Sequence, residues 1–155
     1  METNTLQELL LDTMPRWHYW IAKPFKSLLD DGVSLGMYYC IQTLRQHGES
    51  MTMSELAGAM HCSKQQMTRT VERLAGCGFV ERMTDPCDRR IIRLQLTQSG
   101  RDYTGQFLEQ DCAYYHRLIG SLSPQQQEEL YGALQTLNAI FDSMPDDHAQ
   151  PREKG

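Results

Sequence analysis

The sequence predicts a mostly helical fold that carries one small two-stranded β-wing. Two capping boxes, at residues 52–55 and 63–66, mark the starts of two short helices that a tight turn joins. Two strand-like runs then flank a charged tip at residues 85–90, which indicates an antiparallel hairpin. A helix pair followed by a basic hairpin is the layout of a winged helix-turn-helix, in which one helix enters the major groove of DNA.

Helices are also expected before this motif. Residues 5–30 read as a helix that is interrupted or kinked at Pro15 and Pro24, because proline removes a backbone donor. Another helix is expected to start at Ser34 and to stop at Gly48.

The two helices of the motif each show one apolar face. In the first, helical spacing predicts burial of Met53, Leu56, Ala57 and Met60. In the second, it predicts burial of Met67, Val71 and Leu74. The turn between them is at His61-Cys62, and the glycines at positions 76 and 78 are placed to end the second helix.

The polar face of the second helix has the residue types that read DNA. At about 100° per residue, Gln65 and Arg69 point away from the apolar stripe, and both types pair with base edges, so we expect them to contact bases. Gln66 is a further candidate. The set also includes the capping Ser63 and three residues suited to phosphate contacts: Lys64, Thr68 and Arg73. An ordinary solvated helix face, in which Gln66 only completes the cap, is the alternative interpretation.

The hairpin is expected to pair residues 79–83 with residues 91–96. Alternation along the second strand gives it one packed face, with Ile92, Leu94 and Leu96. Arg89 and Arg90 at the tip suit a narrow minor groove, and Asp88 is expected to pair with a nearby arginine and fix the shape of the tip. The alternative is a charged surface turn without a role in binding.

In combination, these residues resemble the MarR (multiple-antibiotic-resistance regulator) family of bacterial transcription regulators. The resemblance covers roughly fifty residues, and these motifs carry it: Thr52-x-x-Glu55-Leu56-Ala57, Ser63-Lys64, Thr68-Arg69, Leu74, Gly78-Phe79-Val80-Glu81-Arg82, Asp85-Pro86-x-Asp88-Arg89-Arg90 and Leu96-Thr97-x-x-Gly100. It implies an obligate dimer that binds a pseudo-palindromic operator and releases it on ligand binding or cysteine oxidation. Asp88 and Arg90 correspond to the wing aspartate and minor-groove arginine of the family, whereas Cys87 departs from the family pattern.

The remaining segments are expected to form helices that mediate dimerisation. Thr97 or Ser99 is expected to cap one long helix that runs to about Leu122, and Ser123 to cap a last one with an apolar stripe. We therefore assign residues 1–33 and 99–144 to a helical dimerisation region and residues 34–98 to the winged DNA-binding domain. Residues 145–155 are expected to form a disordered tail.

Charge separates the winged segment from the rest of the chain. Residues 52–101 contain eight lysines and arginines against five acidic residues, a net +3, whereas the whole chain carries −5, so the remainder carries −8. A basic excess confined to one segment is the electrostatic footprint of a surface that binds nucleic acid.

The effector is predicted less directly. Aromatic residues gather in the first helices, and Trp17, His18, Tyr38 and Tyr39 could form the walls of a pocket for a small aromatic or anionic ligand. The alternative is that they are core and interface residues.

Cysteine chemistry gives a second hypothesis. The five cysteines show no CxxC spacing, and Cys87 at the wing tip lies close to two arginines that favour the thiolate. A repressor that senses oxidants or copper through Cys87 or Cys62 is therefore an alternative. No metal-ligand set and no cofactor motif is recognisable.

Other classes of protein have less support. The sequence shows no phosphate-binding loop and no nucleophile with a base at motif spacing, so we do not expect an enzyme. It shows no signal peptide and no apolar stretch long enough to span a bilayer, which predicts a cytoplasmic location. A repressor that binds double-stranded DNA as a homodimer is the preferred interpretation, and a winged-helix module that binds protein is the alternative of another class.

Overall fold

A computed structural model describes residues 3–109 and 113–145, and the chain divides into two compact units, residues 1–35 and 36–155. Within the described residues, no helix is both long and apolar enough to cross a membrane. Residues 146–155, most of the tail that was expected to be disordered, lie outside the described part of the chain.

The first unit is helical. It contains α1 (Thr3–Trp17), a π-helical turn (His18–Ala22) and α2 (Lys23–Lys26). The change from α- to π-helix follows Pro15, and Pro24 lies in the first turn of α2, so the interruption expected near the prolines is present. The apolar side chains of α1 remain exposed: Leu6, Leu9, Leu10, Leu11 and Met14.

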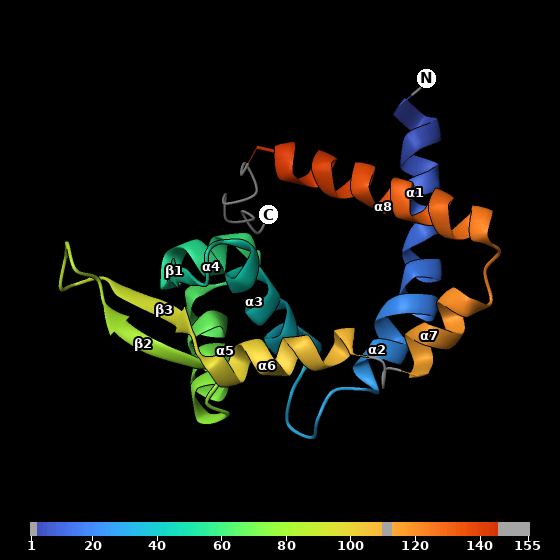
Figure 1. The fold of residues 1–155 in the computed structure, drawn as a ribbon. Coiled ribbons are helices and arrows are strands. Elements are labelled where there is room, and N and C mark those ends of the chain that lie inside the picture. Colours follow the sequence, from blue (N-terminus) through green and yellow to red (C-terminus); the bar gives the residue numbers. More distant parts are fainter. Residues whose placement is uncertain (1–2, 110–112, 146–155) are drawn as a thin grey trace. The chain divides into compact units, whose positions relative to one another are not determined.

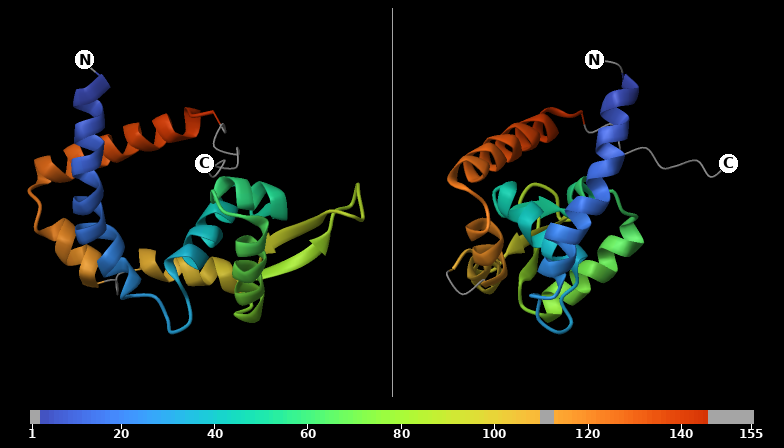
Figure 2. Two further views of the ribbon diagram at one scale, coloured as in Figure 1. Left: turned by 180° about the vertical axis from the view of Figure 1, so that it is seen from behind. Right: turned by 90° about the vertical axis from the view of Figure 1, so that its right-hand side faces the viewer.

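The second unit contains the winged motif, which Figure 1 shows in green and yellow. Its elements are α3 (Leu35–Gln46), β1 (Ser50–Thr52), α4 (Met53–Ala59), α5 (Lys64–Gly76), β2 (Val80–Thr84), β3 (Ile92–Leu96), α6 (Gln98–Gly105), a 3₁₀ turn (Gln106–Leu108), α7 (Ala113–Gly120) and α8 (Pro124–Ser143). The helix pair α4–α5 and the hairpin β2–β3 confirm the predicted winged helix-turn-helix. In the left view of Figure 2 the hairpin extends as a thin ribbon.

The sheet has three strands, one more than the sequence predicted. All pairs are antiparallel in the order β1-β3-β2, so β3 is the central strand. Strand β1 was missed because it has three residues and its last, Thr52, is also the N-cap of α4. Only its pairing with a segment more than forty residues away defines it as a strand.

Most apolar residues of the motif form the core that was expected, but of the four predicted in α4 only Leu56 and Ala57 are buried, and Met53 and Met60 are half-buried. The stripe Met67, Val71 and Leu74 of α5 is buried, and so are Leu94 and Leu96 of β3. Helix α3 adds buried Met37, Ile41 and Leu44. The expected packing of Ile92 is wrong, since its side chain is 46% exposed. Ile92 lies beyond the last residue of β3 that pairs with β1, so the ribbon there has no third strand beside it.

Local capping fixes where the helices begin. Both predicted capping boxes are present: Glu55 donates its backbone N–H to the Thr52 hydroxyl at 3.1 Å, and Gln66 donates to the Ser63 hydroxyl at 3.2 Å. In the turn between α4 and α5, His61 takes a left-handed backbone with φ 49°. Gly78, with φ 75°, follows α5 where a stop was predicted.

The long helix expected from Thr97 or Ser99 to Leu122 is wrong. Thr97 does cap α6, but α6 ends at Gly105 and continues only as a 3₁₀ turn. Glu109 then takes an extended backbone with ψ 162°. At this end of α6 the Tyr103 ring packs against the rings of Phe79 and Phe107, with centroids 4.6 and 5.5 Å away.

Gly100 allows α6 to approach the sheet closely. A Cβ at this position would lie 2.4 Å from the backbone oxygen of Phe79 and 2.7 Å from a methyl carbon of Leu96. We expect Gly100→Ala to lower the free energy of unfolding by about 1–3 kcal/mol, because the backbone must move to relieve the overlap. Denaturant titration of the purified protein measures this change.

Gly105→Ala in the same helix is the matched control, since an added Cβ there meets no atom within 4 Å. We expect it to leave stability unchanged or to raise it by up to about 1 kcal/mol, because alanine favours helix. Equal stability of the Gly100→Ala variant and the parent would contradict the close approach.

Candidate nucleic-acid interface

One face of α5 is solvent-exposed along its length. Gln65, Arg69 and Arg73 are exposed, whereas the opposite stripe that includes Met67 and Val71 is buried. Within the described residues, the side chains of Gln65 and Arg69 make no hydrogen bond. The helix therefore presents two long polar side chains, as the angular analysis of the sequence predicted.

The N-terminus of α5 is held by its own side chains. Ser63 donates its backbone N–H to the Gln66 amide oxygen at 3.2 Å, which completes the capping box. The Thr68 hydroxyl donates to the carbonyl oxygen of Lys64 at 2.9 Å. The Gln66 side chain thus completes the cap, as the alternative interpretation proposed, and Lys64 is left exposed at the start of the helix.

The wing tip presents one arginine in a fixed orientation. Arg90 donates from Nε to Asp88 Oδ1 and from Nη2 to Asp88 Oδ2, both at 3.1 Å, while its side chain is 90% exposed. The same carboxylate accepts the backbone N–H of Arg90 at 3.0 Å. The expected pairing of Asp88 with an arginine is confirmed. These hydrogen bonds from Arg90 lower the pKa of Asp88.

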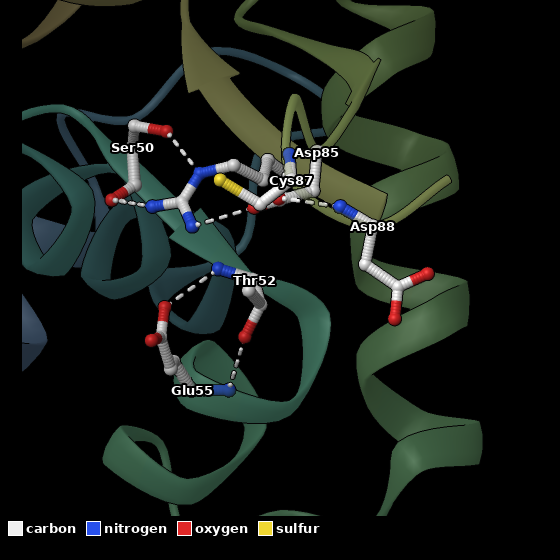
Figure 3. A network of polar contacts seen from close by, with 7 residues as sticks. Ser50, Thr52, Glu55, Asp85, Cys87 and Asp88 are labelled. Carbon is white, nitrogen blue, oxygen red and sulfur yellow. Dashed lines mark hydrogen bonds and ion pairs between the residues drawn. The ribbon is translucent and has the colours of Figure 1, made fainter. Parts of the chain in front are cut away.

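A second aspartate holds the other side of the tip. Asp85 Oδ1 accepts the backbone N–H groups of Cys87 at 2.8 Å and of Asp88 at 3.2 Å (Figure 3). The bond from the Cys87 amide is the main cause of a lowered pKa at Asp85, and the guanidinium of Arg93 adds to it. Both carboxylates therefore act in the ionised form, in which they can accept several hydrogen bonds.

A groove of about 590 Å³ lies between the helix pair and the wing. Its basic residues come from both sides: Lys64 from α5, and Arg82 and Arg90 from the wing, with Glu72 as the single acidic residue of its lining. Its apolar lining residues are Met53, Met67, Ile91 and Ile92. Arg82 could not be assigned to this groove from the sequence, because only the register of β2 with β3 places it on the same face of the ribbon as Ile92.

The four residues proposed for an effector pocket belong to different units. Trp17 and His18 lie in the first unit and are exposed, whereas Tyr38 and Tyr39 lie on α3 in the second. The Tyr38 ring packs edge-to-face against Tyr39 and Phe107, with centroids 6.4 and 5.7 Å away. Tyr38 is therefore part of an aromatic cluster of the second unit, and the structure does not define a common pocket for the four residues.

The cysteines differ in their surroundings. Cys87 is exposed at the wing tip, and Cys62 is partly buried in the turn before α5. Burial raises the pKa of the Cys62 thiol, which reduces the fraction of reactive thiolate at neutral pH. Burial in α3 raises the pKa of Cys40 to about 12. Among the described residues, no three His, Cys, Asp or Glu side chains are grouped so that they could hold a metal ion.

Comparisons with known proteins agree with this geometry. The model of the MarR family matches residues 33–92. The transcriptional repressor MprA of Escherichia coli K12 is 29% identical over 123 residues, which cover 79% of this chain and 70% of MprA. The regulator BilQ of Clostridium symbiosum is 30% identical over 115 residues, which cover 71% of this chain and 76% of BilQ.

Solved structures share the fold. RV1404 from Mycobacterium tuberculosis superposes with a TM-score of 0.74 at 22% identity and covers 94% of this chain and 98% of its own. The organohalide-sensing regulator RdhR, solved with bound 2,4-dichlorophenol, superposes with a TM-score of 0.61 at 20% identity, covering 87% and 80% of the two chains.

The lowered pKa values at the wing predict how stability depends on pH. A carboxylate with a depressed folded-state pKa stabilises the fold above its ordinary value of 3.8, and this contribution is lost as the pH falls through the folded-state pKa. Asp85→Asn imitates the protonated form. We therefore expect the difference in unfolding free energy between parent and Asp85→Asn to be largest above about pH 5 and to shrink on acidification.

Denaturant titrations at several pH values between 7 and 3 measure this difference. A difference that stays constant down to pH 3 would contradict the assignment of an ionised, hydrogen-bonded Asp85.

Proposed function

This chain belongs to the MarR family and is a DNA-binding transcription regulator, and we propose that it acts as a dimeric repressor on a pseudo-palindromic operator. The observation that carries this proposal is the pairing of the exposed polar face of α5 with an arginine held at the wing tip, on either side of one basic groove. The name of the relative MprA, a transcriptional repressor, favours repression.

We assign base contacts to α5. Gln65 and Arg69 are exposed near the start of the helix, where a recognition helix reads bases, and they can pair with adenine and guanine edges. Lys64, Thr68 and Arg73 flank them and are assigned to phosphates. Ser63 and Gln66 hold the N-terminus of the helix, whose free N–H groups also favour a phosphate.

We assign minor-groove contact to the wing. Arg90 would enter the groove, with Asp88 setting its orientation and Arg89 reaching the adjacent backbone. The phosphate strand that separates a major groove from the neighbouring minor groove would then run along the basic groove, where Arg82 joins Lys64 as a contact.

Dimerisation would cover apolar surfaces that each chain leaves exposed. α1 exposes Leu9 and Met14, and α8 exposes Ile140 and Phe141. Surfaces of this kind mark protein interfaces. We therefore assign dimerisation to the helices of residues 1–33 and 99–144. A two-fold axis between two wings requires half-sites that are about one turn of DNA, roughly 34–36 Å, apart.

A small aromatic or anionic ligand is the proposed releasing signal. RdhR, a neighbour in fold, was solved with a chlorinated phenol. Trp17, His18, Tyr38 and Tyr39 remain our candidates for the ligand site, because flat rings with a few polar tips suit such a molecule. The alternative signal is oxidation or copper binding at Cys87, whose exposure favours reaction, or at Cys62.

The direct test is fluorescence anisotropy with DNA from immediately upstream of the gene that encodes this chain, against scrambled DNA, over a salt series. We expect tight, sequence-selective binding that weakens steeply with salt, because binding releases counterions from the phosphates. Equal, weak binding to both DNAs would contradict the proposed operator and would favour a winged-helix module that binds protein.

Two substitutions distinguish the proposed contacts. Arg69→Ala should weaken operator binding by about 1–3 kcal/mol and relax the preference at one base pair in each half-site. Arg90→Ala should weaken binding to a similar extent, with its largest effect on operators whose outer flanks are A·T-rich. Arg45→Ala, on α3 and outside the groove, removes one charge as a control. Equal affinity of all three variants would refute the site assignment.

The same assay tests the releasing signal. We expect phenolic acids to release operator DNA from the parent and from a Cys62→Ser, Cys87→Ser variant alike, since the proposed ligand site contains neither cysteine. Release of the parent by peroxide or copper that the double variant resists would instead support the thiol alternative.

A further inference from the structure

The three-stranded part of the sheet ends at Arg93, where the two-stranded wing begins. Strand β1 pairs with β3 only from Arg93 to Gln95, whereas β2 pairs with β3 from Ile92 to Leu96. Beyond Arg93, toward the tip, the sheet therefore continues as a two-stranded ribbon. Such a ribbon is marginally stable by itself and twists more freely than a wider sheet. The side chain at this boundary can control the direction in which the tip projects.

Arg93 joins both neighbouring strands across one face of the sheet. Its Nε donates to the Ser50 hydroxyl at 3.1 Å and its Nη2 to the Ser50 carbonyl oxygen at 3.4 Å, both on β1. Its Nη1 donates to Asp85 Oδ2 at 3.3 Å, just beyond the end of β2. In Figure 3, dashed lines lead from Ser50 and from Asp85 to the guanidinium that lies between them. The guanidinium thus connects the base of the wing to the strand that leads into α4.

Asp85 transmits this connection to the tip. While Oδ2 accepts from Arg93, Oδ1 accepts the backbone N–H groups of Cys87 and Asp88. Asp88 in turn holds the side chain of Arg90 through two hydrogen bonds. A continuous series of hydrogen bonds therefore runs from Ser50 through Arg93, Asp85 and Asp88 to the exposed guanidinium of Arg90.

Arg93 does not face the proposed DNA groove. The strand register places Arg82 and Ile92, which line that groove, on one face of the ribbon, and places Arg93 on the other. Arg93 instead lines a second groove, together with Ser50, His47 and His61. Any effect of Arg93 on the operator must pass through other residues.

We propose that Arg93 is a positioning residue of the operator interface, which sets the wing tip, and with it Arg90, relative to the helix pair. This inference rests on the proposed function, because it assigns Arg90 to the minor groove. The guanidinium keeps the tip ordered before DNA arrives, so that less conformational entropy is lost when the arginine enters the groove.

A double-mutant cycle between Arg93→Met and Arg90→Ala tests this coupling. We expect Arg93→Met to weaken operator binding about tenfold in the parent. When Arg90 is already alanine, we expect a loss of less than about twofold, because the position of the tip affects affinity only through the contact that Arg90 makes. Arg101→Met is the matched control: it removes the charge of an arginine of similar exposure and breaks an ion pair, to Glu49, away from the wing tip. It should change binding less than about twofold.

Hydrogen exchange without DNA gives a second measurement. We expect the amides of Cys87 and Asp88 to exchange faster in Arg93→Met than in the parent and in Arg101→Met, because Asp85 is then less firmly held. Asp85→Asn, which keeps an acceptor for both amides, should reproduce the loss of operator affinity and its dependence on Arg90. If Arg93→Met fails to fold, Asp85→Asn replaces it in the double-mutant cycle with Arg90→Ala.

The outcomes separate this inference from the proposed function. Equal losses in the two backgrounds, or unchanged exchange at both amides, would overturn the positioning role and leave the operator contacts in place. A full loss from Arg93→Met with none from Arg90→Ala would overturn both the positioning role and the wing contact. If the parent shows no selectivity for operator DNA, the proposed function fails, and amide exchange alone decides whether Arg93 orders the tip.

Discussion

The pairing of β3 with both of its neighbours is the constraint on which the winged motif depends. Through β1 it fixes Thr52, which caps α4, and through β2 it fixes the start of the wing. Its buried Leu94 and Leu96 supply the apolar contact that stabilises this arrangement. Thr97 directly after it caps α6 and donates its hydroxyl to the carbonyl oxygen of Gly78 at 2.6 Å. One five-residue strand thus positions the helix pair, the wing and the next helix.

The uneven distribution of charge along the chain favours one face of the protein for the approach to DNA. The segment that contains α4, α5 and the wing carries a positive excess, whereas the rest of the chain is acidic. An acidic remainder repels phosphates, so a chain with this distribution approaches DNA through one face. Glu72, within the groove, is an exception that opposes the surrounding basic residues. At low salt the attraction is long-ranged, and at physiological salt it acts over about 8 Å, so the placement of each basic side chain determines the result.

Features encoded by neighbouring residues could be predicted from the sequence, and features that depend on distant contacts could not. The caps at Thr52 and Ser63 use partners three residues away, and the α5 stripe follows from a single period, so both predictions are confirmed. Strand β1 and the contacts of Arg93 with Ser50 join segments 43 residues apart, which no local pattern shows. The end of α6 at Gly105 was missed because a single glycine is tolerated within a helical pattern and no proline marks the stop.

The wing tip and the exposed face of α5 differ in how far their side chains are ordered before DNA binds. Arg90 is already oriented by Asp88, so little rotamer freedom remains for DNA to remove. Its ion pair is exposed and screened, and therefore contributes orientation more than stability. Gln65 and Arg69 on α5 are exposed and have no such partner within the described residues, so the proposed base contacts would cost them rotamer freedom. If both contact DNA as proposed, an ordered wing would set the register of the protein, and the adaptable helix face would adjust to the base sequence.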